Sequence, residues 1–311
     1  MTLLHNDPNA TDRLYHKIQE DHPHFDPPCL LRDRVESLYE TCHELVDKKF
    51  PSQIKHDFAS CYSELYFCTS FIKRLGMNVT HPSDKGPDYY LQSLDCWAEI
   101  VTISNGDINK PNSISKPELG IVGDGFADEN KIILRITSSF TDKANKILTY
   151  LENGMIKSSA RIIVCISGGW LDPYFRLPLY PEGSFPAVVK ALLPIGHMVL
   201  HLNRDNMTVY EITSQYRDHV TKKNQNKGGE AIRTDYFIDP KYRFISGVLF
   251  SYANITDSIE DSLLGRDFFM IHNPLALNPL PLGTFKCGIE YYVEHSDVGI
   301  NISTIEHEKK S

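Results

Sequence analysis

The sequence contains no run of eighteen apolar residues and no apolar leader at its amino terminus. A membrane-spanning helix needs about twenty consecutive apolar residues, so no transmembrane segment is predicted. A secretory signal carries an apolar stretch close to its start, whereas the first twenty residues here are polar. We therefore expect a soluble, cytoplasmic protein without a membrane partner.

Closely spaced cysteine pairs are also missing. The seven cysteines are scattered, their number is odd, and no Cys-x-x-Cys pair occurs. A zinc ribbon depends on such pairs, and a disulfide framework usually has an even number of cysteines, so the sequence predicts neither. We expect the thiols to be reduced and mostly buried.

The chain has no excess of basic residues. It contains 32 Lys and Arg against 40 Asp and Glu, a formal net charge of −8. Non-specific nucleic-acid binding needs clustered Lys and Arg, so a general basic coat is excluded, although a local basic groove remains open. With 311 residues, 41% of them hydrophobic, the chain can bury a substantial core. It shows neither an internal repeat nor a sharp change of composition.

Hydrophobic periodicity predicts a helical first part followed by short strands. One helix is expected from Leu31 to about Lys48, and a second from about Ser52 to Leu75, where Gly76 ends it. Residues 104–130 are rich in Asn, Gly, Pro, Ser and Asp and predict a long loop. The elements expected around this loop are strands over 77–80, 86–91 and 96–103, a brief apolar stretch over 132–136, a helix over 137–154 and a buried strand over 161–167.

The second half predicts a short helix and a series of strands. Residues 217–233 are polar and carry Lys222, Lys223 and Lys227 without periodicity, which predicts a basic loop, with phosphate contact as the alternative. We expect an irregular arm over residues 1–30, a core over 31–170, and a β-rich C-terminal extension over 171–311 packed on the same core. The remaining expected elements are a helix over 186–193 and strands over 198–202, 207–212, 244–252, 267–272 and 287–293.

Three acidic residues occupy positions that suit a metal site. Asp88 follows a Gly-Pro corner and Glu99 is flanked by β-forming residues, so a hairpin turning near Ser93 to Asp95 would bring both carboxylates to one end of a small sheet. Glu64 lies in the middle of a predicted helix. It is either a surface carboxylate or a helix acid directed at the strand carboxylates. One or two carboxylates, completed by water and substrate phosphate, are a usual Mg²⁺ site.

Residues 52–167 resemble the PD-(D/E)XK nuclease superfamily, the fold of many restriction endonucleases and of repair and recombination nucleases. The predicted element order is close to the αβββαβ core of that family. In its pattern Asp88 matches the acid of the first motif, Glu99 the acid of the second, and Glu64 the acid often contributed by the first helix. The resemblance implies a restriction-endonuclease-like α/β (α+β) fold, with a central mixed sheet flanked by helices. It also implies a nuclease that uses Mg²⁺ or Mn²⁺ and acts on DNA rather than RNA, and it leaves a homodimer open.

One position departs from the family pattern. The residue two after Glu99 should be a lysine but is Val101, which neither donates a proton nor holds charge. In some members of the superfamily the basic residue has migrated onto the following helix, where this chain has Lys143 and, less favourably, Lys146. The alternative is a catalytically inactive member that binds nucleic acid or protein, with Lys143 an ordinary surface lysine. Arg135, just before the predicted helix, either reaches the phosphate or pairs with an acid.

Other notable segments carry weaker signals. Gly120–Gly125 is glycine-rich but lacks the Lys-Ser/Thr ending of a phosphate loop, so it predicts a flexible turn. His197, His201 and His272 stand alone on apolar segments, which is typical of satisfied core histidines. Residues 273–281 contain two Asn-Pro steps whose side chains can fasten a loop, and we expect them to close the C-terminal extension over the core.

Overall fold

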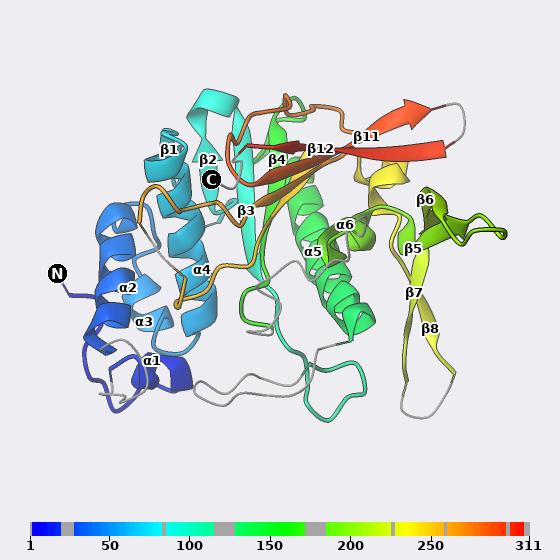
Figure 1. The fold of residues 1–311 in the computed structure, drawn as a ribbon. Helices are drawn as coiled ribbons and strands as arrows, with labels where there is room; N and C mark the ends of the chain where they lie inside the picture. Colours follow the sequence, from blue (N-terminus) through cyan, green and yellow to red (C-terminus); the bar gives the residue numbers. More distant parts are fainter. Residues whose placement is uncertain are drawn as a thin grey trace.

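The structure is a computed structural model that describes residues 2–19, 28–82, 85–114, 128–171, 185–224, 228–257, 260–296 and 299–307. An eight-stranded mixed sheet lies at its centre, with helices on both faces (Figure 1). The mixed α/β architecture predicted from the sequence is therefore confirmed. The strands, in their spatial order, are β1 (Val79–Thr80), β2 (Tyr89–Leu91), β3 (Cys96–Thr102), β4 (Arg161–Ser167), β9 (Gly247–Ser251), β10 (Phe269–His272), β11 (Ile289–Ser296) and β12 (Gly299–Glu306).

The helices fall into two groups, one on each face of the sheet (Figure 1). The first group precedes the sheet in sequence, and the second contains the helix between β3 and β4. The helices are α1 (Arg13–Lys17), α2 (Pro28–Cys42), α3 (Phe50–Gln53) and α4 (Phe58–Thr69) on one side, and α5 (Glu129–Glu152) and α6 (Ala187–Leu192) on the other. None of the helices in the described ranges is long and apolar enough to cross a membrane.

The pairing of the first strands positions the acidic residues. β2 pairs antiparallel with both β1 and β3, and the turn between β2 and β3 is the 3₁₀ segment η2 (Gln92–Leu94), as the predicted hairpin requires. β3 then pairs parallel with β4, so the chain must cross over between them, and α5 lies in this crossover. β9 pairs parallel with the other edge of β4 and continues the sheet into the C-terminal half.

Alternation along β3 decides which helix each side chain meets. Ala98 and Ile100 lie in the hydrophobic cluster that contains α2 and α4, whereas Trp97 and Val101 pack against the cluster that contains α5 and α6. Successive side chains of a strand point to opposite faces. Glu99, between Ala98 and Ile100, therefore faces α5.

Two of the predicted helices have different bounds in the structure. The stretch from Ser52 to Leu75 is divided into α3, α4 and the π-helical turn η1 (Ser70–Arg74), because the side chain of Asp57 caps a new helix by accepting from the Ser60 N–H at 3.3 Å. Gly76 follows η1 with φ +61°, as expected of a helix-ending glycine. The first predicted helix, α2, already ends at Cys42.

The largest difference concerns α5. It begins at Glu129 instead of Thr137, because Asp128 caps it by accepting from the Asn130 N–H at 2.9 Å. Arg135 therefore lies inside the helix and not before it. The longer helix also brings Ile132 and Ile133 into the core.

The prediction of a basic loop over residues 217–233 is wrong. The segment contains a two-stranded antiparallel hairpin of β7 (His219–Lys222) and β8 (Glu230–Arg233), in which Val220 is 3% exposed and joins the α5 cluster. Because few other residues of this hairpin are apolar, its alternation is hard to detect. Lys227 lies outside the described residues, as does the glycine-rich segment over 120–125.

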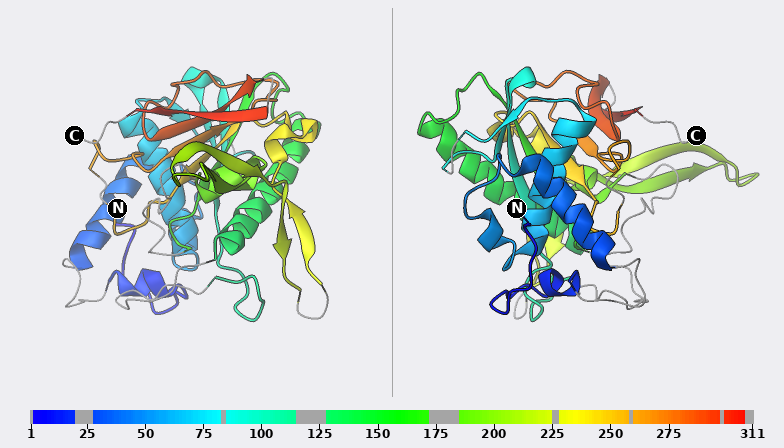
Figure 2. Two further views of the ribbon diagram at one scale, coloured as in Figure 1. Left: turned by 45° about the vertical axis from the view of Figure 1, so that its right-hand side comes forward. Right: turned by 90° about the vertical axis from the view of Figure 1, so that its left-hand side faces the viewer.

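A second hairpin extends away from the body of the molecule, as the yellow-green ribbon of Figure 2 shows. It pairs β5 (Ile195–Leu202) with β6 (Val209–Tyr216), which the sequence predicts as strands, but it is separate from the main sheet. His197 and His201 lie on it; His197 is exposed and His201 is only half-buried. The prediction that these two are core histidines is therefore wrong.

The described termini and connections close the core. Leu3, Leu4 and Tyr15 from the predicted irregular arm are buried beside α2 and α4. In the 273–281 segment, Asn273 donates to the carbonyls of Tyr242 and Ile245, which confirms its fastening role. Further elements are the 3₁₀ turns η4 (Tyr236–Ile238) and η5 (Pro240–Tyr242). The cysteines whose side chains are described are free and buried, namely 42, 61, 68, 96, 165 and 287.

Candidate active site

Glu99 is fully buried on β3 and is contacted by two lysines of α5. Nζ of Lys143 and Nζ of Lys146 each lie 2.6 Å from the same oxygen, Oε1 of Glu99. The lysines are three residues apart and therefore project from one face of the helix. Their side chains are 19% and 47% exposed, so they connect the buried carboxylate with the surface. The sequence ranked Lys146 second, but the structure places both ammonium groups equally close.

The two oxygens of Glu99 differ in their surroundings. Oε1 accepts two charge-assisted hydrogen bonds, the strongest kind in proteins. Oε2 is buried without a hydrogen-bond partner in the described part of the chain. Although partial burial opposes it, the hydrogen bond to Glu99 raises the pKa of Lys146 above its usual value. The two short contacts and the raised pKa of Lys146 indicate a strong electrostatic interaction at Oε1. Oε2 of Glu99 remains as an acceptor for a further ligand.

Asp88 is held next to this carboxylate by the backbone of β3. Its Oδ2 accepts from the Ile100 N–H at 2.5 Å, and Tyr150 of α5 donates to the Gly86 carbonyl at 3.0 Å, which fastens the Gly-Pro corner. Burial and then the charge of Glu99 raise the pKa of Asp88 to about 6. The predicted proximity of Asp88 and Glu99 is thus present in the structure.

Glu64 lies on the other side of the sheet, on α4. Its Oε1 accepts from the Tyr89 hydroxyl at 3.2 Å, and Tyr89 belongs to the α2 and α4 cluster. Burial and then the charge of Asp88 raise the pKa of Glu64 to about 7. The charge of Asp88 is therefore coupled to both of the other acids. Glu64 and Glu99 themselves lie on opposite faces of the sheet.

His81 also lies at this site, and sequence reasoning missed it. Its Nδ1 is 2.8 Å from the backbone oxygen of Asp88, and its ring packs against Tyr89. A positive charge on His81 acts on Glu64 and opposes the rise of the Glu64 pKa. The available signal was its place directly after β1, the strand that pairs with β2.

Burial and the charge of Glu99 raise the pKa of Asp88, and a divalent cation beside the two carboxylates would relieve this repulsion. Among the residues with described coordinates, no three His, Cys, Asp or Glu side chains are grouped to hold one metal ion. Asp88 and Glu99 nevertheless suit Mg²⁺, which often takes one or two carboxylates and completes its shell with water and substrate. The unpartnered Oε2 of Glu99 is consistent with such a ligand.

Two further residues named by the sequence lie nearby on these elements. Val101 packs against the α5 and α6 cluster, on the same face of β3 as Glu99. Arg135 packs closely on the backbone of the loop after β3, because a Cβ added to Gly106 would lie 2.4 Å from Nη1 of Arg135. Val101 therefore lies where a strand lysine would reach Glu99.

A second buried ionic cluster is located at β10 and β11. Glu290 is fully buried and lies 2.8 Å from Nε2 of His272 and 2.8 Å from Nε2 of His307, and it accepts from the Gly283 N–H at 3.0 Å. His272 is thus a satisfied core histidine, as predicted. The cluster joins β10, β11 and the residue after β12.

Comparison of the chain with family models, with curated proteins and with solved structures finds no match in any of the three.

Proposed function

We propose that the chain is a divalent-metal-dependent nuclease of the PD-(D/E)XK type that hydrolyses phosphodiester bonds in DNA. The observation that carries this proposal is the contact of the Lys143 and Lys146 ammonium groups with Glu99. Val101 faces the same side of β3, so an ammonium supplied by α5 replaces the one that a lysine at residue 101 would supply.

The connection of the elements supports the same proposal. α4 is followed by β1, β2 and β3, then by α5 and β4, with two antiparallel pairs and one parallel pair. This order supports a restriction-endonuclease-like core, whose pattern is αβββαβ. Asp88 directly precedes its second strand, Glu99 lies on the third and Glu64 on the first helix, as the family pattern requires.

The side chains can be given roles in hydrolysis. Asp88 and Glu99 would hold Mg²⁺ or Mn²⁺, and Glu64 lies close enough for the charge of Asp88 to raise its pKa. When bound there, the ion supplies Lewis-acid activation of the phosphoryl oxygen and of a water. Lys143 orients that water or stabilises the negative charge that develops on phosphorus. Lys146, the more exposed of the two lysines, attracts the approaching phosphodiester.

A catalytically inactive protein of the same fold, which binds nucleic acid or protein, is the second candidate. The observation that favours this candidate is that two lysines contact Oε1 of Glu99. Their positive charges balance the buried carboxylate without a metal. In that case the acids and lysines form a structural ion cluster.

Incubation with plasmid, single-stranded DNA and RNA in Mg²⁺ or Mn²⁺ separates the two candidates. The wild type should cleave DNA, and Asp88→Ala and Glu99→Gln should abolish cleavage while the control Asp142→Ala on α5 retains it. Thermal unfolding of each variant checks that the fold is kept. Equal behaviour of the wild type and the folded Asp88→Ala variant would overturn the nuclease proposal.

A further inference from the structure

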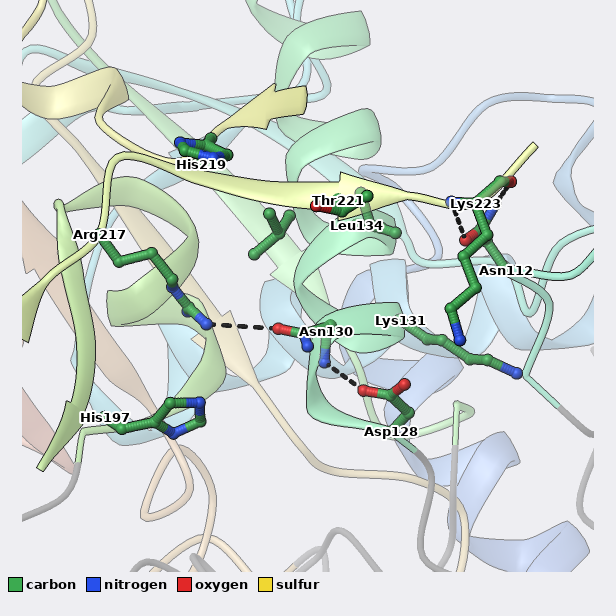
Figure 3. A pocket seen from close by; sticks show the side chains of 11 residues that line it. Asn112, Asp128, Asn130, Lys131, Leu134, His197, Arg217, His219, Thr221 and Lys223 are labelled. Atoms are coloured by element: carbon green, nitrogen blue, oxygen red, sulfur yellow. Dashed lines mark hydrogen bonds between the residues drawn. The ribbon is translucent and has the colours of Figure 1, made fainter. Parts of the chain in front are cut away.

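A cavity of about 350 Å³ lies at the amino-terminal end of α5, between that helix and the strand β7 (Figure 3). Its size is within the range of small-ligand sites. Five of the side chains that line it are basic or can become so: Lys131, His197, Arg217, His219 and Lys223. Such a concentration is unexpected in a chain with a net charge of −8.

The acids close to the cavity are already engaged by other groups. Asp128 caps α5, Glu129 forms an ion pair with Lys190 at 2.7 Å, and Asp218 pairs with His219 at 2.6 Å. Asp128 is the one acid among the lining residues that the structure describes. The cationic side chains, rather than the capped helix end, therefore determine the charge of the cavity.

Arg217 has unused hydrogen-bonding capacity. Its Nη1 donates to Oδ1 of Asn130 at 3.3 Å, as the dashed line in Figure 3 shows. Its Nε and Nη2 are buried and have no partner among the residues that the structure describes. Burial lowers the pKa of Arg217, although Glu129 opposes this. An anion that accepts from these two nitrogens would satisfy both of them, since a guanidinium binds phosphate through paired N–H groups.

The two lysines are placed by contacts that leave their charge available. The backbone of Lys223 is held by Asn112, which accepts from its N–H at 2.9 Å and donates to its carbonyl at 2.6 Å. Lys131 donates to a neutral acceptor, the Ser113 carbonyl, at 3.0 Å. Figure 3 shows both side chains extending along the same side of the cavity. Asn112 and Ser113 thus hold the two lysines at the cavity.

We infer that this cavity binds a backbone phosphate of the nucleic acid at a distance from the scissile bond. Lys131 and Lys143 are on the same helix, and a rise of 1.5 Å per residue puts them about 18 Å apart along its axis. Because B-DNA advances about 3.4 Å per base pair, this distance corresponds to about five base pairs. The inference rests on the proposal that the chain acts on nucleic acid, and it assigns a second contact that fixes how the duplex lies.

Binding of a fluorescent duplex, followed by anisotropy without divalent metal, tests the site. A duplex of about twenty base pairs is long enough to reach from the lysines of α5 to the cavity. For this duplex, Lys223→Glu and the pair Arg217→Ala and Lys223→Ala should weaken binding about tenfold or more. The double variant should also reduce the slope of log affinity against log salt by about one, the contribution of the one phosphate that the cavity neutralises.

Lys222→Ala is the matched control. Lys222 is the last residue of β7 and directly precedes Lys223, but it pairs with Glu230 at 3.8 Å and does not line the cavity. The control variant should bind the duplex like the wild type. Lys223 is exposed, so Lys223→Glu tests the site even if Arg217→Ala disturbs the fold. Unchanged affinity and salt slope in folded Lys223→Glu and in the double variant would overturn the inference.

Two further results separate the sources of the anion and the two proposals. Calorimetry with inorganic phosphate shows whether the cavity binds a free anion. If phosphate binds the wild type and the variants keep their affinity for DNA, the cavity is a small-anion site and the inference is overturned. If the wild type cleaves no DNA but Lys223→Glu still loses duplex binding, the nuclease proposal is overturned and the inference is supported. If cleavage requires Asp88 but does not depend on Lys223 or Arg217, the nuclease proposal is supported and the inference is overturned.

Discussion

Nζ of Lys143 lies 2.6 Å from Oε1 of Glu99, although 44 residues separate the two in sequence. Lys146 contacts the same oxygen from one helical turn further on. Because Glu99 is 0% exposed, its charge would be uncompensated in the interior without these lysines. The lysines of α5 therefore have two separable effects, one on stability and one on the proposed chemistry.

The stability effect should be strongly non-additive. Lys143→Met and Lys146→Met together should lower the free energy of unfolding by about 3–5 kcal/mol, because they leave a buried carboxylate unpaired. Each single variant should cost less than about 1 kcal/mol, since the other lysine still pairs with Glu99. Urea unfolding measures these values. In a Glu99→Gln background the double substitution should be close to neutral, and simple additivity of the two singles would contradict a shared partner.

The activity effect should distinguish the two lysines. Lys143 is 19% exposed and Lys146 is 47% exposed, so solvent screens Lys146 more strongly. Lys143→Ala should lower the rate of DNA cleavage about a hundredfold, as for the loss of one preorganised electrostatic donor, and Lys146→Ala about tenfold. Single-turnover cleavage in Mg²⁺ provides the measurement. A larger loss in Lys146→Ala would reverse this assignment.

A lysine returned to the strand should restore part of the lost activity. Val101 faces the same side of β3 as Glu99, so Val101→Lys places an ammonium at the family position. In the Lys143→Ala background this change should raise the cleavage rate about tenfold, within the range of one electrostatic donor. Val101→Met adds length without charge and should give no recovery. Equal rates for the two substitutions would show that charge at this position has no role.

The hydroxyl of Tyr66 should contribute more to stability than that of Tyr62. Tyr66 donates to the buried carboxylate of Asp267 at 2.5 Å, whereas Tyr62 donates to the neutral Asn254 carbonyl at 3.0 Å. Hydrogen bonds to charged groups contribute about 1.5–3 kcal/mol and neutral ones about 1 kcal/mol. Tyr66→Phe should therefore lower the unfolding free energy about twice as much as Tyr62→Phe in urea titrations. Equal losses in the two variants would mean that Asp267 is neutral in the folded protein and would contradict this prediction.

Stability should depend on the ionisation of Glu290. Burial opposes that ionisation, but hydrogen bonds from His272, Gly283 and His307 lower the pKa of Glu290 below 4.5. A lowered carboxyl pKa contributes stability that is present above the unfolded pKa and is lost as the pH falls through the folded pKa. Glu290→Gln should thus cost about 1–3 kcal/mol at pH 7. In thermal unfolding, the difference from wild type should shrink below about pH 4.5, and a constant difference would contradict this linkage.

The strands near the acids are predicted well because their signals are local. β4 has the predicted bounds, Arg161–Ser167, since it is a continuous apolar run ended by two glycines. Asp88 and Glu99 belong to a hairpin with a short turn, so their proximity follows from neighbouring residues alone. The order of elements and the pairing of the two acids were therefore accessible from the sequence.

The signals that failed depend on distant contacts or are obscured by polar residues. The start of α5 is polar, so its cap at Asp128 is hard to separate from the preceding loop. β7 forms although it has little apolar alternation, because Val220 packs in the α5 cluster. The equal distances of Lys143 and Lys146 from Glu99 require the packing of α5 on the sheet, which spacing along the chain does not specify.

The lysines of α5 make the site sensitive to a movement that would not affect a strand lysine. A strand lysine is fixed by its hydrogen-bonded neighbours, whereas a shift of α5 by one residue rotates its side chains by about 100°. Both ammonium groups would then leave Glu99 together. Phe140 and Ile147 are fully buried in the core beneath α5 and hold it in register. Truncating either one would weaken the packing that holds both lysines against Glu99, without altering any acidic residue.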